Sequence, residues 1–194
     1  MEIDNLKKPI GKQDQYLCAN SGFNSFTFFD NNQVKKNEFS IEKLDTLNRL
    51  VQDFYLIPTY KNRNTDKVLS EIKKDIKSSE KILEIRSIAS SFLSFNDKRE
   101  YKIEEIFHNS IRESWNIKKT LSEVMTPSLI EQYEMINNLI PNNWIRLIGA
   151  GKGGYFLVSS KINRDKIQEL KDIKGVKGIF KADISNQGLS SFTL

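Results

Sequence analysis

The sequence predicts an α+β protein in which helices pack on one face of an antiparallel sheet. Strand-like segments stand near both ends of the chain, and a long middle stretch has apolar residues at helical spacing. The resulting order is strands, a helical block, and then strand, strand, helix, strand, which is typical of α+β domains. A length of 194 residues suits one domain, or a domain with an appended segment.

The first predicted element is a β-hairpin. Residues 23–29 alternate polar and aromatic side chains, which is typical of a strand. Asp30–Asn32 is a turn sequence, and residues 34–39 supply a second strand. Arg49–Ile57 reads as another strand, closed by Pro58.

Helical spacing begins at residue 65. A first helix starts at Thr65 or Asp66 as N-cap, and its stripe shifts after residues 78–79, so the helix bends there or a second one begins. A broad apolar stripe then predicts a helix over residues 103–121, with the lone His108 as a structural residue on it. A further helix begins at Thr126 as cap and runs to about residue 139.

The last part of the chain returns to strands. Residues 144–148 and 155–159 are short apolar strands on either side of a glycine run. Asn163 is predicted to cap a helix through about residue 173, with Gly175 as its C-terminal glycine. Residues 176–184 form the last predicted strand.

Composition limits the class of protein. Apolar residues make up 38% and charged residues 28%, with a formal charge of +5, and the basic residues are mostly interleaved with acids, as in residues 97–100. Mixed-charge surfaces explain this pattern better than a nucleic-acid patch. No apolar run could span a membrane, and Met1–Asp4 lack a secretory pattern, so we expect a cytoplasmic protein. A single cysteine, Cys18, and the lack of a Cys/His cluster give no disulfide or metal site.

A carboxylate in a polar run is the first candidate for chemistry. Asp14 lies between Gln13 and Gln15, just after Gly11, which would let backbone approach a ligand closely. Transfer of a phosphoryl group to a hydroxyl often uses one carboxylate to accept the hydroxyl proton. By its chemistry alone, an aspartate in such a run is more often a cap or a solvated turn residue.

The glycine run is the second candidate. The segment Gly149-Ala-Gly-Lys-Gly-Gly154 joins two strands and has Gly153 where a Walker loop has Ser or Thr, so it is not a Walker loop. A tight turn is the simpler interpretation. Four glycines in six residues exceed what one turn requires, and such a loop could present backbone N–H groups to an anion.

These two segments resemble signature blocks of the GHMP small-molecule kinases, closest to the heptose 7-phosphate kinase branch. The matching blocks are Gly11–Tyr16, Gly22–Asn24, Glu113–Ser122 and Gly149–Gly154, with Arg146 at the basic position three residues before the glycine run. The resemblance implies that Asp14 is the catalytic acid. It implies that substrate is bound by Gly11, Lys12, Gln13 and Gln15. It also implies a loop that binds phosphate or nucleotide, made of Arg146, Gly149, Ala150, Gly151, Lys152, Gly153 and Gly154.

The resemblance also implies an organisation. Residues 1–64 would be the tail of the N-terminal kinase domain, and residues 65–194 a C-terminal domain with a ferredoxin-like sheet. The expected activity is transfer of the γ-phosphoryl group of ATP to a sugar phosphate. The family's phosphate-binding segment, Pro-x-x-x-Gly-Leu-Gly-Ser-Ser, has no equivalent in this sequence. We therefore expect ATP and Mg²⁺ to be held mainly by a missing segment, no turnover from this chain alone, and a separate N-terminal half or a homo-oligomer as partner.

One departure from the family and two alternatives accompany this prediction. The family has Thr-Gly after its central strand, whereas Thr59 is followed by Tyr60, so positioning of substrate by that loop is in doubt. The first alternative function is a non-catalytic domain that binds sugar phosphates or acts through protein contacts. The second is a basic nucleic-acid-binding domain.

Overall fold

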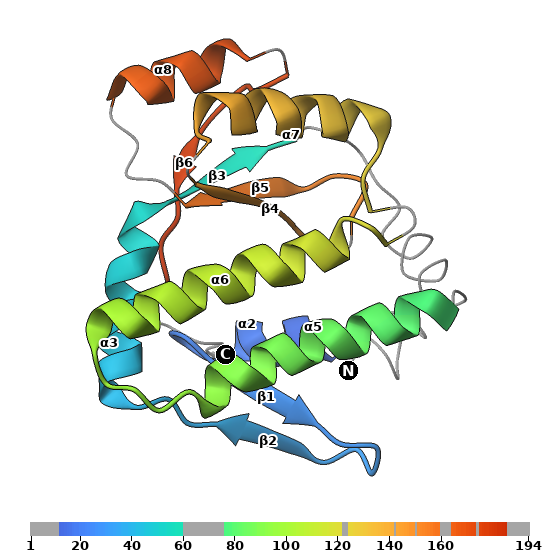
Figure 1. The fold of residues 1–194 in the computed structure, drawn as a ribbon, viewed down its shortest axis with the longest axis vertical. Helices are drawn as coiled ribbons and strands as arrows, with labels where there is room; N and C mark the ends of the chain where they lie inside the picture. The colour runs from blue at the N-terminus through green and yellow to red at the C-terminus, as the bar shows by residue number, and fades with distance from the viewer. Residues whose placement is uncertain are drawn as a thin grey trace, which may run out of the picture.

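A computed structural model describes residues 12–59, 76–121, 124–141, 143–149, 151–159, 164–173 and 175–185. The elements, in chain order, are α2 (Gln13–Ala19), β1 (Ser25–Phe28), β2 (Val34–Asn37), α3 (Ile41–Leu50), a 3₁₀ turn (Val51–Asp53), β3 (Phe54–Pro58), α5 (Ile76–Ser94), α6 (Glu100–Lys118), α7 (Pro127–Leu139), β4 (Trp144–Ile148), β5 (Tyr155–Ser159), α8 (Arg164–Asp172) and β6 (Phe180–Lys181). Figure 1 shows them in layers, with α7 and α8 on one side of a sheet and α6, α5 and the β1–β2 hairpin on the other.

The main sheet has the strand order β4-β5-β3-β6, and its neighbours all pair antiparallel. Along the chain the unit runs β3, helices, β4, β5, α8, β6, which is the ferredoxin-like βαββαβ arrangement. The predicted α+β fold class with an antiparallel sheet is therefore confirmed, whereas the helices pack on both faces of the sheet and not on one. The division at residues 64 and 65 stays a prediction, although β3 lies before that point and pairs with β5 and β6 after it.

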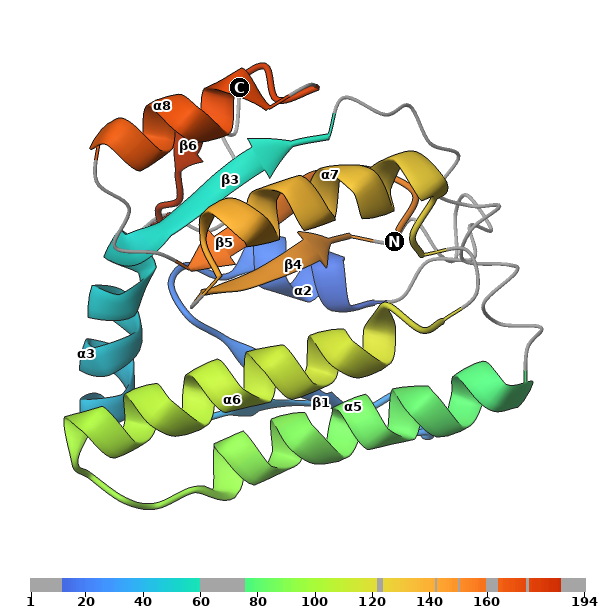
Figure 2. The same cartoon turned by 45° about the horizontal axis from the view of Figure 1, so that its top comes forward.

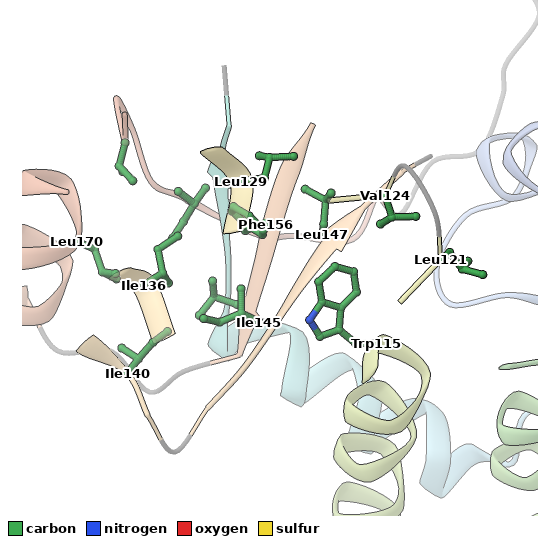
Figure 3. Packing of buried hydrophobic residues seen from close by; sticks show 13 residues of the cluster. Trp115, Leu121, Val124, Leu129, Ile136, Ile140, Ile145, Leu147, Phe156 and Leu170 are labelled. Carbon is green, nitrogen blue, oxygen red and sulfur yellow. The ribbon is translucent and has the colours of Figure 1, made fainter. Parts of the chain in front are cut away.

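One face of the sheet and the helices above it enclose the larger core. Alternate residues of three strands face α7 and α8, because successive side chains of a strand point to opposite faces. Figure 3 shows this packing around Phe156. Its buried members are Ile57, Trp115, Leu121, Val124, Leu129, Ile136, Ile140, Ile145, Leu147, Phe156, Val158, Leu170 and Val176. Burial of each large apolar side chain contributes about 1.5–3 kcal/mol, so this cluster holds the helices on the sheet.

The opposite face of the sheet carries a smaller core. Phe54 and Trp144 pack there with Leu50 at the end of α3, and Phe107 of α6 stacks on Phe54 with ring centroids 6.2 Å apart. Helix α6 therefore also packs against this second face, below the sheet in Figure 2. Because Arg146 is two residues from Trp144 on β4, it lies on the same face.

Several predicted elements are confirmed. The β1–β2 hairpin pairs Phe28 with Val34 across the predicted turn. Thr126 caps α7 by accepting a hydrogen bond from Leu129 N–H, and Gly175 has a φ of 91°. None of the described helices has the length and apolar character needed to cross a membrane.

Other elements correct the prediction. The strand predicted from Arg49 begins only at Phe54, because residues 41–53 form α3 and the 3₁₀ turn. Ser40 caps α3 by accepting a hydrogen bond from Lys43 N–H. The last strand covers only Phe180–Lys181 of the predicted 176–184. Helix α5 runs without a break through residues 78–79, while the predicted caps at residues 65, 66 and 163 lie outside the described residues.

Two buried polar side chains join separate elements. Lys43 of α3 is 6% exposed, and its Nζ donates to the carbonyls of Phe92 (3.0 Å) and Leu93 (2.9 Å) at the end of α5. The indole N–H of Trp144 donates to His108 Nδ1 at 2.6 Å, which leaves the proton of the neutral imidazole on Nε2. Burial lowers the pKa of both Lys43 and His108. The hydrogen bond to Trp144 supports a structural role for His108, which stays a prediction.

Candidate active site

The glycine run forms the turn between β4 and β5. All five of its described residues have positive φ: 93° at Gly149, 115° at Gly151, 55° at Lys152, 147° at Gly153 and 112° at Gly154. Glycine reaches this region of backbone space without a steric penalty, whereas residues with a Cβ rarely do. The excess of glycines is thus explained by the backbone path, and Ala150 lies outside the described residues.

Three other segments hold this loop in place. The N–H of Lys152 donates to the carbonyl of Val124 at 2.8 Å, and Lys118 Nζ at the end of α6 donates to the carbonyl of Gly149 at 2.7 Å. Thr59, just after β3, bonds Gly154 through its backbone and its hydroxyl. The loop is therefore anchored at its start, middle and end.

Thr59 and Lys118 are site residues whose role sequence reasoning missed. The sequence draws attention to Thr59 only through the Thr-Gly turn that is lost after it. Its hydroxyl donates to the carbonyl of Gly154 (3.0 Å) and accepts from the same residue's N–H (2.9 Å). Lys118 falls in the family block Glu113–Ser122, which was the available signal for it. Both act on the loop through hydrogen bonds to its backbone.

Arg146 lies on the second sheet face, beneath the loop. Its Nη1 donates to Ser114 Oγ of α6 at 3.2 Å, and that hydroxyl donates in turn to the carbonyl of Ile111 at 3.1 Å. Burial lowers the pKa of Arg146, although a guanidinium stays protonated in any protein. The structure thus places a half-buried positive charge on this face of the sheet.

The aspartate block begins α2. Asp14 is exposed, in the first turn of the helix. Among the described residues, no hydrogen bond or ion pair joins it to the glycine loop. Lys12 Nζ donates to Asn32 Oδ1 at 2.7 Å, and Gly11 lies outside the described residues.

The two glutamines beside Asp14 differ in exposure, because Gln13 is exposed and Gln15 is half-buried. Both side-chain polar atoms of Gln15 are enclosed by protein without a hydrogen-bond partner. Gln13 lines a cavity of about 520 Å³ that Arg146 also lines. The structure therefore brings the aspartate block and the basic residue of the glycine loop to one cavity through Gln13, while direct cooperation of Asp14 with the loop stays a prediction.

The resemblance implies ATP and Mg²⁺ as ligands. Within the described part of the chain, no group of three His, Cys, Asp or Glu side chains could hold a metal ion.

Known structures share this fold. A mevalonate kinase matches with a TM-score of 0.55 and 21% identity, over 81% of this chain and 46% of that one. The Methanococcus jannaschii mevalonate kinase gives a TM-score of 0.54 and 20% identity, over 81% and 46%. An L. major mevalonate kinase in complex with R-mevalonate gives 0.56 and 12%, over 87% and 50%.

These matches define the fold class. The chain has the fold of GHMP-type kinases, and it spans about half the length of the solved structures that it matches. No protein-family model matches the chain, and no curated protein matches it.

Proposed function

We propose that this chain supplies part of the active site of an ATP-dependent kinase of the GHMP type. The observation that carries the proposal is the anchored, positive-φ loop Gly149–Gly154 within a fold shared with mevalonate kinases. The aspartate block supports it, because Gln13 of that block reaches the same cavity as Arg146 of the loop strand.

The proposed acceptor is a sugar phosphate such as heptose 7-phosphate, phosphorylated at its anomeric hydroxyl. The sequence blocks Gly11–Tyr16 and Gly22–Asn24 support this choice. The carboxylate of Asp14 accepts or steers the hydroxyl proton while the hydroxyl oxygen bonds to the γ-phosphorus and ADP leaves. The glycine loop shapes the phosphate site, and Lys152 adds positive charge there.

The proposal includes a second component. ATP and Mg²⁺ are held mainly by a nucleotide-binding segment, on a separate half or a second copy, and the enzyme works in the cytoplasm. The lengths of the matched kinases support this, since the chain covers 46% of two of them. The division into residues 1–64 and 65–194 belongs to the same proposal.

A second candidate function is sugar-phosphate binding without catalysis. The exposed Asp14, with no hydrogen bond or ion pair to the described part of the glycine loop, favours it. Under this function the chain binds the sugar phosphate, and adding a nucleotide-binding half gives no turnover.

The test measures ADP release with heptose 7-phosphate, using the chain alone and the chain co-purified with the amino-terminal half of a heptose-phosphate kinase. We expect turnover only with both halves. Asp14→Asn should lower kcat by about 10²–10⁴-fold, the usual contribution of a general base, whereas Asp30→Asn, an exposed turn aspartate, should not. Full activity of Asp14→Asn would exclude the catalytic role, and binding without turnover would support the second function.

A further inference from the structure

A cavity of about 520 Å³ lies between α2, β1, α5, α6 and the second face of the sheet. Its volume is within the range typical of small-molecule sites, which are mostly apolar with a few well-placed polar groups. The lining fits that description: phenylalanines from β1, α5 and α6 form much of its wall, and Gln13, Ser110 and Ser114 are among its few polar residues. The cavity is therefore suited to a small organic molecule.

The charge inside this cavity is positive. Arg146 and Arg86 line it, and among the residues that the structure describes no aspartate or glutamate does. Among the described residues, Ser114 is the hydrogen-bond partner of Arg146, and no carboxylate lies within ion-pairing distance of it. A guanidinium has five N–H donors, so most of them are left for another acceptor.

Arg146 is half-buried. A charge that is partly removed from water and lacks a counter-charge is costly, and proteins normally pair such groups. Ser114 fixes one end of the guanidinium by accepting a hydrogen bond from Nη1 of Arg146. The Ser114 hydroxyl is itself held in place, because it donates to the carbonyl of Ile111. An anion in the cavity would supply the missing charge and could accept two parallel hydrogen bonds from Arg146.

We propose that this cavity binds a phosphate monoester, with its phosphate on Arg146 and its carbon skeleton against the phenylalanine wall formed by Phe26, Phe28 and Phe92. The role of this cavity as the acceptor pocket of the kinase rests on the proposed function. In that role Arg146 holds the phosphate that the acceptor already carries, and not the phosphoryl group that is transferred from ATP. Ligand binding itself does not require that function.

The two sources of such a monoester are a sugar phosphate and an alkyl phosphate. Isothermal titration without ATP would compare D-glycero-D-manno-heptose 7-phosphate, n-hexyl phosphate and inorganic phosphate on the full chain. We expect at least one ester to bind ten-fold or more tightly than inorganic phosphate, and the tighter ester identifies the source. Equal affinity of inorganic phosphate and both esters, or no binding by any of the three, would overturn the proposal.

Two variants and a control complete the test. Arg146→Met should weaken binding of the preferred ester by at least ten-fold, while Arg112→Met, on the same helix as Ser114 but outside the cavity lining, should not. Because Arg146 is half-buried and hydrogen-bonded to Ser114, the melting temperature of its variant is measured first.

Ala89→Phe provides an independent check, since Ala89 is exposed on α5 and lines the cavity. It should remove the advantage of the ester over inorganic phosphate and leave Arg146 in place. Wild-type ester affinity in both Arg146→Met and Ala89→Phe would refute the site. Ester binding without ATP turnover in the two-half assay would refute the kinase and retain the pocket.

Discussion

Replacement of Thr59 by valine tests how the glycine loop is held. The Thr59 side chain is 3% exposed, and its hydroxyl makes two hydrogen bonds with Gly154, at 3.0 Å to the carbonyl and 2.9 Å from the N–H. Valine keeps the shape, so no cavity forms. The Gly154 carbonyl keeps its bond from the Thr59 backbone, but the Gly154 N–H loses its acceptor. A buried group left unpaired costs about 1–3 kcal/mol.

Urea denaturation would measure this cost as a change in the free energy of unfolding. If the free energy of unfolding falls by about 2 kcal/mol, we expect the melting temperature to fall by about 4–8 °C in a chain of this size. Thr46→Val is the matched control, because Thr46 is also 3% exposed and its hydroxyl donates at 2.8 Å to the carbonyl of Glu42, which also has a helical partner. Equal destabilisation by the two substitutions would refute the reasoning, and Thr59→Ser should stay near wild type.

Two further predictions concern the buried polar links. Lys43→Met should lower the free energy of unfolding by about 1.5–3 kcal/mol, the value of a charged hydrogen bond, because the carbonyls of Phe92 and Leu93 lose their donor. Urea denaturation measures this change, and a variant more stable than the wild type would contradict the prediction. Burial lowers the pKa of His108 below its ordinary 6.5. The unfolded chain therefore binds a proton that the folded chain does not, so stability is full above pH 6.5 and falls as the pH drops below it. His108→Gln, which keeps an acceptor for Trp144, should reduce this pH dependence in denaturation series from pH 7.5 to about 5, and an unchanged series would contradict the assignment.

The elements that sequence reasoning predicted well have strong local signals. Helix α7 has a threonine cap and a first-turn proline, and the hairpin has a turn sequence between alternating segments. Strands β4 and β5 are short apolar runs separated by glycines. In each case the local sequence and the tertiary packing favour the same conformation.

Helix α3 was missed because two patterns overlap at its end. Leu44, Leu47 and Leu50 have helical spacing after the Ser40 cap, but Leu50 and Val51 also stand only two residues before the apolar run of β3. The strand interpretation therefore took in residues that belong to the helix and its 3₁₀ turn. Burial of Leu47 and Leu50 stabilises the helix instead.

The candidate site was predicted only in part. The alternation of side chains along β4 already places Arg146 on the opposite face of the sheet from Ile145 and Leu147. Which of the two faces packs against α7 and α8 depends on tertiary packing. The hydrogen bonds of Lys118 and Thr59 to the loop join residues 31 and 95 positions apart. No local pattern encodes contacts over such separations.

The pairing of β3 with β5 also has a consequence for the order in which the molecule folds. The residue that closes the glycine loop is Thr59, and its partner Gly154 is synthesised 95 residues later. Closing so long a stretch of chain carries a large entropic cost and slows the formation of such contacts. The loop can therefore reach its final shape only after most of this polypeptide has left the ribosome, which makes it one of the last parts of the protein to mature.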